Sequence, residues 1–281
     1  MMGYEDGDGE VLRHMIAAAR AAGEIVRSAH SCRNAGRAEV STKSNPQDLV
    51  TLTDLRSQRE IFSRLRALYP SSVFVGEEDQ THDESWRSHS AAFIVDPVDG
   101  TTNFVHGLRD VAICIAFVRH GIPHVGVVYN PIQDTLYHGV RGQGAFRNAL
   151  RIHVSGCTQL ALALVCTEVG SARDPDSVRV ITRVIGHLME VQTIRGMRML
   201  GSGALDLCYV ADGTLDAVYA GVAREGWHIW DHAAASVIVH EAGGVLKTCR
   251  GEPFDIASKS VLCCASPQLA EALVRAIKSQ I

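Results

Sequence analysis

The sequence predicts an α/β fold with mixed sheets, and three features of its 281 residues lead to this prediction. Residues 10–30 carry apolar side chains at helical spacing. Four segments typical of β-strands follow one another in the stretch 111–152, separated by turn residues. From residue 162 onward, apolar segments of strand length alternate with amphipathic helical segments. Such alternation predicts helices that cover the sheets on both faces.

The composition limits the classes of function. Lys and Arg number 27 against 31 Asp and Glu, and no basic run is present that could form a nucleic-acid groove. No apolar run approaches the roughly 20 residues that span a bilayer, and the first ten residues are polar and acidic. The 8 cysteines include no C-x-x-C pair, which suits a reducing compartment. We therefore expect a cytoplasmic protein that binds neither nucleic acid nor a membrane.

The domain organisation is expected to be simple, because no repeat, low-complexity tract or linker divides the chain. We expect a single domain over residues 1–281, in which residues 1–9 form a flexible tail. Two sub-regions, 10–155 and 156–281, are expected to meet at the functional site.

Two helices are expected in the first seventy residues. The first spans residues 10–30, and its apolar positions are Leu12, Met15, Ile16, Ala19, Ala22, Ile25, Val26 and Ala29. A short apolar strand then leads into a second helix, for which Thr53 or Asp54 is the expected N-cap. The inward-facing side chains of this second helix are expected to be Leu55, Ile61, Leu65 and Leu68.

Two strands of the first half lead directly to acidic residues. The apolar segments 72–76 and 91–95 are followed by Glu77 and Asp96. Pro97 cannot donate a hydrogen bond to a neighbouring strand, so the second strand is expected to end there. An acid after a strand can simply belong to a solvated turn. Two such strands close together in the sequence instead favour a site at the carboxyl edge of a sheet.

The stretch from Asp96 to Thr102 concentrates groups that can do chemistry. Asp96 and Asp99 flank a Pro-Val turn, a spacing that lets both carboxylates converge on one point. Carboxylates this close repel each other unless a cation lies between them. Gly100 lets the backbone approach a ligand, and Thr101-Thr102 can begin a helix whose free N–H groups attract an anion. Donors for a metal and for a phosphate are therefore adjacent.

The remaining elements follow from turn residues and periodicity. An antiparallel run is expected over residues 111–118, 123–129, 135–140 and 144–152. Gly142-Gln143-Gly144 is half of a dinucleotide-binding pattern, but it follows no βαβ unit and indicates a hairpin turn. In the second half we expect strands at 162–168, 193–199, 214–220, 244–249 and 260–265, and helices at 175–191, 203–211, 231–242 and 267–279. Asp231 opens one of these helices, where it could serve as an N-cap.

Three histidines raise zinc binding as an alternative. His228 and His232 are four residues apart, and His240 follows on the same expected helix. The pattern lacks the glutamate of the H-E-x-x-H motif, and no set of thiolates accompanies it. The oxygen donors nearby favour a hard cation instead.

The motifs resemble those of a known family. The stretch 96–102, Asp-Pro-Val-Asp-Gly-Thr-Thr, resembles the signature of the inositol monophosphatase family. Residues 48–54 resemble its DLVTxTD motif, residues 76–78 its GEE motif, and residues 230–244 its second signature, which begins Trp-Asp and ends Glu-Ala-Gly-Gly. The resemblance extends from about Val11 to about Ile277. It implies a layered α-β-α-β-α sandwich, like that of fructose bisphosphatase and inositol monophosphatase.

The resemblance also implies the activity, which is the hydrolysis of inositol monophosphate by a magnesium-dependent, lithium-sensitive enzyme. Two to three Mg²⁺ ions are expected, with Mn²⁺ as a possible substitute. The implied ligands are Glu77, Asp96, the main-chain carbonyl of Val98, Asp99, Thr101 and Asp231. A water oriented by Glu77 and Thr101 would attack phosphorus in line, with Asp54 supporting its environment. Lys43 and Glu78 are implied neighbours of the site.

The implied substrate contacts come from both halves of the chain. They are Asp99, Gly100, Thr101, Thr102, Ser171, Gly201, Ser202, Gly203, Glu225 and Asp231. The segment between Tyr219 and Asp231 is longer than the family pattern, so Glu225 is the candidate for a glutamate that the family places before Trp-Asp. A small phosphorylated polyol and a second copy of the chain, as a homodimer, are the implied partners.

Two other interpretations keep part of this picture. The same metal site could serve another small ester, such as fructose 1,6-bisphosphate, histidinol phosphate, galactose phosphate or a phosphoadenosine phosphate. A protein of this family could also act as a non-catalytic binding or regulatory subunit. Magnesium-dependent release of phosphate distinguishes these classes.

Overall fold

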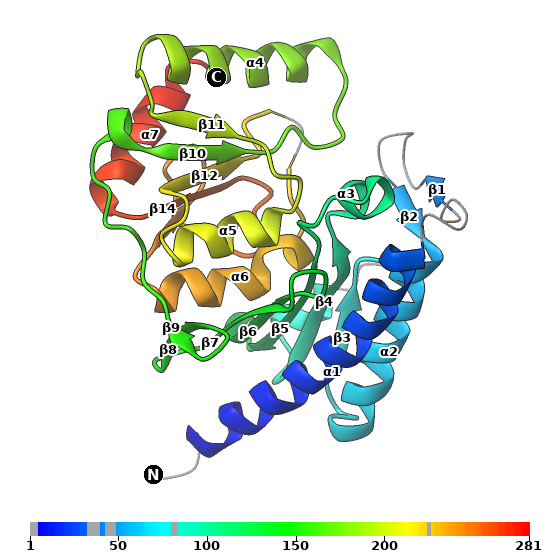
Figure 1. Cartoon of the computed structure of the whole chain (residues 1–281). Helices are drawn as coiled ribbons and strands as arrows, with labels where there is room; N and C mark the ends of the chain where they lie inside the picture. Colours follow the sequence, from blue (N-terminus) through cyan, green and yellow to red (C-terminus); the bar gives the residue numbers. More distant parts are fainter. Residues whose placement is uncertain (1–4, 33–39, 43–48, 80–83, 224–225) are drawn as a thin grey trace.

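The computed structural model describes residues 5–32, 40–42, 49–79, 84–223 and 226–281 (Figure 1). The larger sheet has seven strands in the order β3-β4-β5-β6-β7-β8-β9. Their bounds are β3 Val73–Gly76, β4 Ala92–Asp99, β5 Ala112–Arg119, β6 Ile122–Asn130, β7 Thr135–Val140, β8 Gly144–Arg147 and β9 Leu150–Arg151. Strand β3 is parallel to β4, and every later pair is antiparallel. The sheet is therefore mixed, as predicted.

The second sheet belongs to the C-terminal half. Its five strands stand in the order β11-β10-β12-β14-β13, with bounds β10 Leu164–Thr167, β11 Gly196–Arg198, β12 Ala217–Ala220, β13 Val245–Lys247 and β14 Val261–Cys264. The first three are parallel neighbours, and β14 is antiparallel to both β12 and β13. A separate pair, β1 Val40–Thr42 and β2 Leu49–Thr51, is antiparallel.

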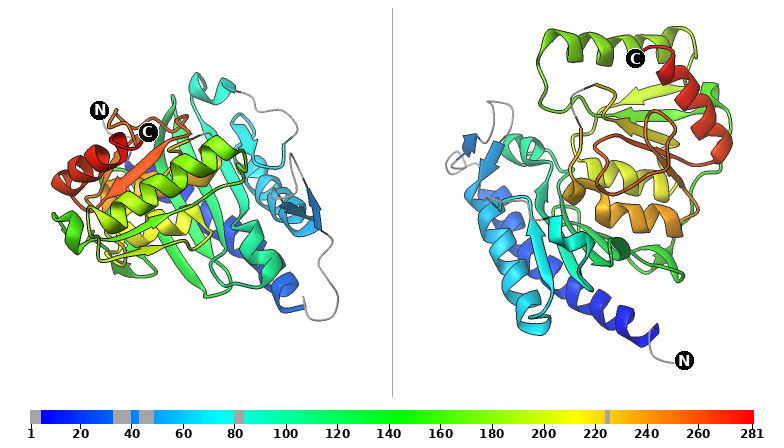
Figure 2. Two further views of the ribbon diagram at one scale, coloured as in Figure 1. Left: turned by 90° about the horizontal axis from the view of Figure 1, so that it is seen from above. Right: turned by 180° about the vertical axis from the view of Figure 1, so that it is seen from behind.

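Three layers of helices alternate with the two large sheets, so the structure has five layers (Figures 1 and 2). Their bounds are α1 Glu5–Cys32, α2 Leu52–Leu68, α3 Thr101–His106, α4 Pro175–Glu190, α5 Gly203–Ala211, α6 Ile229–Glu241 and α7 Pro267–Lys278, with short 3-10 turns at Glu84–Arg87 and Leu160–Leu162. Helices α1 and α2 cover one face of the seven-stranded sheet, α5 and α6 lie between the sheets, and α4 and α7 cover the far face of the second sheet. The predicted α-β-α-β-α sandwich is confirmed.

Strand β4 shows how the sequence produces these layers. All eight of its residues are buried, because both faces of the sheet are covered by helices. Phe93 packs in the core beneath α1 and α2, whereas its neighbour Ile94 packs in the core that contains α5 and α6. Successive side chains thus enter different hydrophobic cores, as the two-residue period of a strand requires.

Local capping explains where several helices begin. Asp174 accepts a hydrogen bond from the Ser177 N–H at the start of α4, and Ser266 accepts one from the Leu269 N–H at the start of α7. Proline follows each cap, a position where its missing N–H costs nothing. None of the described helices has a stretch long and apolar enough to cross a membrane.

Three predicted details were wrong. Helix α1 starts at Glu5 instead of residue 10, and Asp8 within the added turn is buried and forms an ion pair with Arg119 at 2.7 Å. Leu68 of α2 is 52% exposed, because the last turn of the helix passes the edge of the core. The segment 144–152 forms two strands instead of one, separated by a turn in which Asn148 has a φ of 55°.

We predict that Gly126→Ala destabilises the protein. A Cβ atom at residue 126 would lie 2.0 Å from the carbonyl oxygen of Ala234 in α6, and this backbone contact cannot be relieved by a side-chain rotation. We expect a loss of about 1–3 kcal/mol or more, seen as a fall of several degrees in the thermal unfolding midpoint. Gly186→Ala is the matched control, because a Cβ at this α4 position meets nothing within 4 Å. It should stabilise by up to about 1 kcal/mol. Equal midpoints for the two variants would contradict this account of the packing between β6 and α6.

Candidate functional site

The site is organised by an irregularity near the end of β4. Asp96 pairs with Cys114 and Asp99 pairs with Ala112, so three steps along β4 match two steps along β5. The extra residue is a β-bulge, which accommodates Pro97. The prediction that Pro97 ends the strand was therefore wrong. The bulge lets the buried carboxylates of Asp96 and Asp99 lie near one point instead of following the regular alternation of a strand.

Three carboxylates meet at this point. Oxygen atoms of Asp96, Asp99 and Asp231 all lie within 4.8 Å of one another. Asp231 comes from the first turn of α6, and its carboxylate accepts a hydrogen bond from the His228 N–H at 2.6 Å. The N-cap of α6 is therefore His228, and the prediction that Asp231 could be the cap was wrong by three positions.

The electrostatics of the cluster favour a cation. Burial raises the pKa of Asp96 well above its usual range, and the negative charges of Glu77, Asp99 and Asp231 raise it further. Burial also raises the pKa of Asp99 to about 7, against the opposing effect of hydrogen bonds from Ser202 and Ala204. A group of carboxylates that resists ionisation when alone is suited to hold a divalent cation through oxygen ligands.

Glu77 completes the acidic cluster from the neighbouring strand. Its N–H donates to the Val95 carbonyl at 3.1 Å, so the residue directly follows the parallel pair of β3 and β4. Its charge contributes to the raised pKa values of Asp54, Asp96 and Asp99. The structure therefore brings together the two strand ends that the sequence predicted would meet.

Asp54 links the first turn of α2 to the start of α3. Its carboxylate accepts hydrogen bonds from the N–H and hydroxyl of Thr51, and the other oxygen accepts from the Thr101 hydroxyl at 3.1 Å. Thr51 is the N-cap, so the prediction of Thr53 or Asp54 was wrong. The Thr101 hydroxyl also lies 3.0 Å from the Val98 carbonyl oxygen. Burial raises the pKa of Asp54 to about 6.

The second half of the chain reaches the site through the loop before α5. The Ser202 hydroxyl donates to Asp99 at 2.5 Å, and the Ala204 N–H donates to the same oxygen at 2.9 Å. Gly100 permits this close approach. It has a φ of 87°, and a Cβ there would lie 3.0 Å from the Gly201 carbonyl oxygen and 2.9 Å from that of Asp110. A side chain at residue 100 would separate α3 from the loop.

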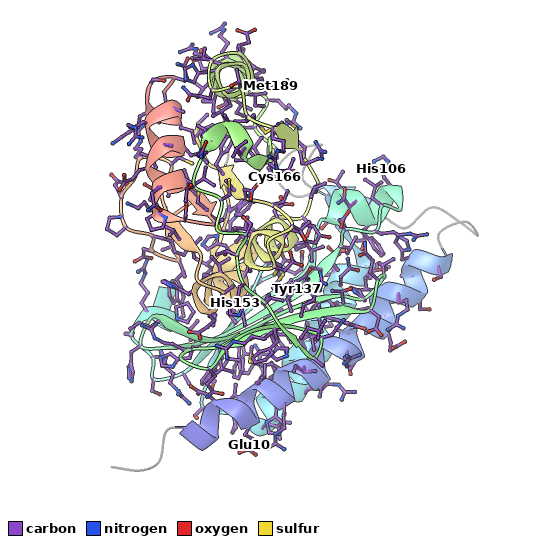
Figure 3. All side chains as sticks on the ribbon, turned by 60° about the vertical axis from the view of Figure 1, so that its left-hand side comes forward. Glu10, His106, Tyr137, His153, Cys166 and Met189 are labelled. Atoms are coloured by element: carbon purple, nitrogen blue, oxygen red, sulfur yellow. The ribbon has the colours of Figure 1, made fainter. Side chains whose placement is uncertain are left out.

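A cavity of about 480 Å³ opens beside the cluster. Its lining residues are Asp99, Thr102, Asn103, His106, Glu168, Val169, Gly170, Arg173, Gly201, Gly203, Trp227 and Asp231. Residues from both halves of the chain contribute, and Figure 3 shows His106 at the outer end of α3. The predicted contacts Asp99, Thr102, Gly201, Gly203 and Asp231 are therefore brought together.

The other predicted site residues either do not line the cavity or are not among the residues that the structure describes. Ser171 is exposed and does not line the cavity, although its neighbours Gly170 and Arg173 do. Glu78 lines a separate hollow beside α2, where its N–H donates to Gln58. Lys43 and Glu225 lie outside the described residues.

The sequence reasoning missed several lining residues. Glu168 accepts hydrogen bonds from the N–H groups of Leu200 and Gly201, both at 2.8 Å. Asn103 donates to the carbonyl oxygens of Asp110 and Leu200, at 2.8 and 2.6 Å. An acid directly after an apolar strand was the signal available for Glu168, as it was for Asp96.

The histidines have structural contacts. His232 is fully buried, its Nε2 lies 2.7 Å from the Ile256 carbonyl oxygen, and burial lowers its pKa to about 4. A carbonyl at this distance requires a proton on Nε2, which removes that atom as a metal ligand. His228 stacks on Trp230 with ring centroids 4.8 Å apart. The arrangement supports oxygen ligation by the aspartates instead of zinc ligation by this histidine pair.

Comparison with known proteins places these features in context. The sequence profile of the inositol monophosphatase family matches residues 8–281. Inositol monophosphatase 1 from Sus scrofa is 39% identical over 270 residues, which cover 96% of this chain and 94% of the relative. The crystal structure of extragenic suppressor protein suhB from Bartonella henselae is similar with a TM-score of 0.85 and 32% identity, covering 97% and 100% of the two chains. The crystal structure of inositol monophosphate-bound SaIMPase-II has a TM-score of 0.76 and 25% identity, covering 95% and 92%.

We predict that the stability of the metal-free protein falls as the pH rises from about 4 through about 7. The folded-state pKa values of Asp54, about 6, and Asp99, about 7, exceed the ordinary value of 3.8. The folded state therefore binds more protons than the unfolded state in this range, and the free energy of unfolding decreases with pH.

Thermal unfolding midpoints measured with a chelator between pH 4 and 8 would test this prediction. Asp99→Asn should show a smaller decrease, since one of the titrating groups is gone, and an excess of divalent cation should reduce the decrease in the wild type. A pH dependence that is the same in Asp99→Asn and the wild type would contradict the assignment.

Proposed function

The chain belongs to the inositol monophosphatase family, and from this premise we propose that it hydrolyses inositol monophosphate to myo-inositol and inorganic phosphate. As a member of this family it is a phosphoric monoester hydrolase. The observation that carries the proposal is the cluster of buried Asp96 and Asp99 with half-buried Asp231, which lies next to the N-terminus of α3 because Asp99 and Gly100 directly precede that helix. Oxygen ligands for cations and amides for a phosphate are thus adjacent.

The donor set fits two or three divalent cations. Glu77, Asp96, the Val98 carbonyl and Thr101 would hold one ion, and Asp96 would share a second with Asp99 and Asp231; a third would lie near Glu77. These donors are all oxygen, which favours Mg²⁺ and permits Mn²⁺. When bound, the cations supply activation of a water and neutralisation of charge on the phosphate.

The protein's own groups provide a route for the proton of the attacking water. The Thr101 hydroxyl lies 3.1 Å from Asp54 and can donate to that carboxylate while it accepts from a water. With a pKa of about 6, Asp54 is mostly ionised at neutral pH and can accept the proton. Glu77, which follows β3, would orient the same water. Asp54, Glu77 and Thr101 are therefore the proposed catalytic residues.

Binding of the two parts of the substrate is divided between the halves of the chain. The N–H groups of the N-cap Gly100 and of Thr101 and Thr102 have no acceptor within α3 and would bind the phosphate. The alcohol would occupy the cavity of about 480 Å³, where Asp99, Asn103 and the Gly201–Gly203 loop offer polar groups for hydroxyls. Ser202, Asp231, and the predicted contacts Ser171 and Glu225 complete the proposed substrate set.

Several finer properties are proposals based on membership in the family. They are inhibition by lithium, assembly as a homodimer, a cytoplasmic location, and a single domain with its two sub-regions meeting at the site. A related small phosphate ester is the second candidate substrate, because the proposed cation ligands act on the phosphate and do not select the alcohol.

We predict that phosphate is released from inositol 1-phosphate with Mg²⁺ and that a chelator stops the release. The assay should include fructose 1,6-bisphosphate, histidinol phosphate and a phosphoadenosine phosphate, and a parallel series with lithium. Preference for another ester would retain the mechanism and change the substrate. The absence of phosphate release from every ester would overturn the catalytic proposal in favour of a binding subunit.

We predict that Asp96→Asn reduces kcat by at least about 100-fold while the fold is retained. Asp96 belongs to both proposed cation sites, and its replacement removes a buried charge that neighbouring acids disfavour. The circular dichroism spectrum should be unchanged, and the metal-free variant should unfold at the same or a higher temperature. The matched control is Asp176→Asn, because the Asp176 side chain is 81% exposed on α4. Turnover of Asp96→Asn close to that of this control would rule out the proposed metal sites.

A further inference from the structure

A second acidic pair lies behind the cavity, at residues that bind no proposed cation. Glu168 follows β10, and Asp206 lies in the first turns of α5. Candidate ligand atoms of these two residues and of Cys166 lie within 4.8 Å of one another. Figure 3 labels Cys166 on β10, in the C-terminal half of the molecule. Asp206 is fully buried, and among the described residues neither of its carboxylate oxygens accepts a well-formed hydrogen bond, although the Cys166 thiol and the Glu168 carboxylate lie next to them.

The negative charges of Asp206 and Glu168 must be reduced by a proton on one of the two acids or balanced by a cation bound between them. An ionised Asp206 would place a buried charge beside the carboxylate of Glu168, with only the weak donor of the Cys166 thiol to stabilise it, which is unfavourable. A cation held by all three residues would need Cys166 as a thiolate, but burial raises the pKa of this thiol and keeps it a weak ligand. One oxygen of Glu168 already accepts two backbone N–H groups. A proton shared between the two acids removes the repulsion and gives one oxygen of Asp206 a partner, while the neutral Cys166 thiol, which lies beside Asp206, can donate weakly to the other.

We infer that Asp206 is protonated at neutral pH and donates a hydrogen bond to Glu168, and that this pair positions the loop that carries the alcohol contacts. Burial and the neighbouring charge of Glu168 raise the pKa of Asp206, in agreement with this geometry. Asp206 is thus a positioning residue, because it acts on the cavity through Glu168. Its effect on the substrate rests on the proposed function.

The loop is held from two sides. Glu168 binds the N–H groups of Leu200 and Gly201, while Asn103 of α3 donates to the Leu200 carbonyl. The next residue, Ser202, donates to Asp99. Loss of the Asp206 proton donor would leave Glu168 less well fixed and allow the loop to shift relative to Asp99. The main expected effect is weaker binding of the alcohol part of the substrate. Apart from Asp99, the proposed cation ligands and the groups that orient the water do not contact this loop through the hydrogen bonds described above.

Two substitutions test whether Asp206 acts as a hydrogen-bond donor or as a negative charge. Asp206→Asn retains a neutral donor toward Glu168, whereas Asp206→Val has no donor. With inositol 1-phosphate and saturating Mg²⁺, Asp206→Val should raise KM by about tenfold or more with a smaller change in kcat, and Asp206→Asn should keep KM within about threefold of the wild type. An Asn variant as impaired as the Val variant would overturn the inference.

An infrared measurement decides the protonation state without relying on turnover. The wild-type spectrum minus the Asp206→Asn spectrum, recorded at pH 7 with Mg²⁺, should contain the C=O stretching band of a protonated carboxylic acid, because groups common to both proteins cancel. A carboxylate band in its place would overturn the inference, as would stoichiometric loss of a bound metal in the Asn variant. If the wild type hydrolysed none of the esters, the proposed function would fail, but the infrared result would still decide the state of Asp206.

Discussion

Mutual repulsion of buried carboxylates is the constraint on which the site depends. Asp96 and Asp99 lie within a fully buried strand, and Asp231 reaches them from α6. Each charge makes the next more costly in a low-dielectric environment. The cluster persists because β4 is fixed by sheet neighbours on both sides and by helices on both faces. A rigid framework therefore holds the acids close together, where either bound protons or a divalent cation would relieve their repulsion.

The same constraint explains how the two halves of the chain are joined. Ser202 and the Ala204 N–H bind Asp99, and Asn103 binds the Leu200 carbonyl, so polar contacts cross between the halves next to the acids. Deeper in the molecule, α6 packs on β6 without space for a single added methyl group at Gly126. Apolar packing sets the distance between the sheets, and the polar contacts set the alignment of the loop. Small displacements of that loop should alter substrate binding before they alter the fold.

The sequence revealed the features that depend on neighbouring residues. Strand periodicity located β3 and β4, and the acids after each strand identified Glu77, Asp96 and Asp99. Features that depend on distant contacts were missed. The bulge at Pro97 exists because β5 continues to pair beyond it. The N-cap is a local exception: Thr51 accepts from the Thr53 N–H and forms a capping box with Asp54, a pattern present in the sequence that the prediction overlooked. The position of Glu168 after an apolar strand was a signal in the sequence, but its hydrogen bonds to the Leu200 and Gly201 N–H groups could be found only from the fold.

Because local patterns can be recognised in the sequence and distant contacts cannot, the sequence predicts the reaction better than it predicts the substrate. Most proposed cation ligands come from two adjacent strand ends and one helix start, so short motifs encode them and the phosphate chemistry can be inferred from sequence. The alcohol would contact a cavity assembled from α3, the residues after β10 and the loop before α5. Its shape depends on hydrogen bonds between residues almost a hundred positions apart, such as that from Asn103 to Leu200. Specificity in this fold can therefore change through loop positioning while the acidic cluster, and with it the reaction, stays the same.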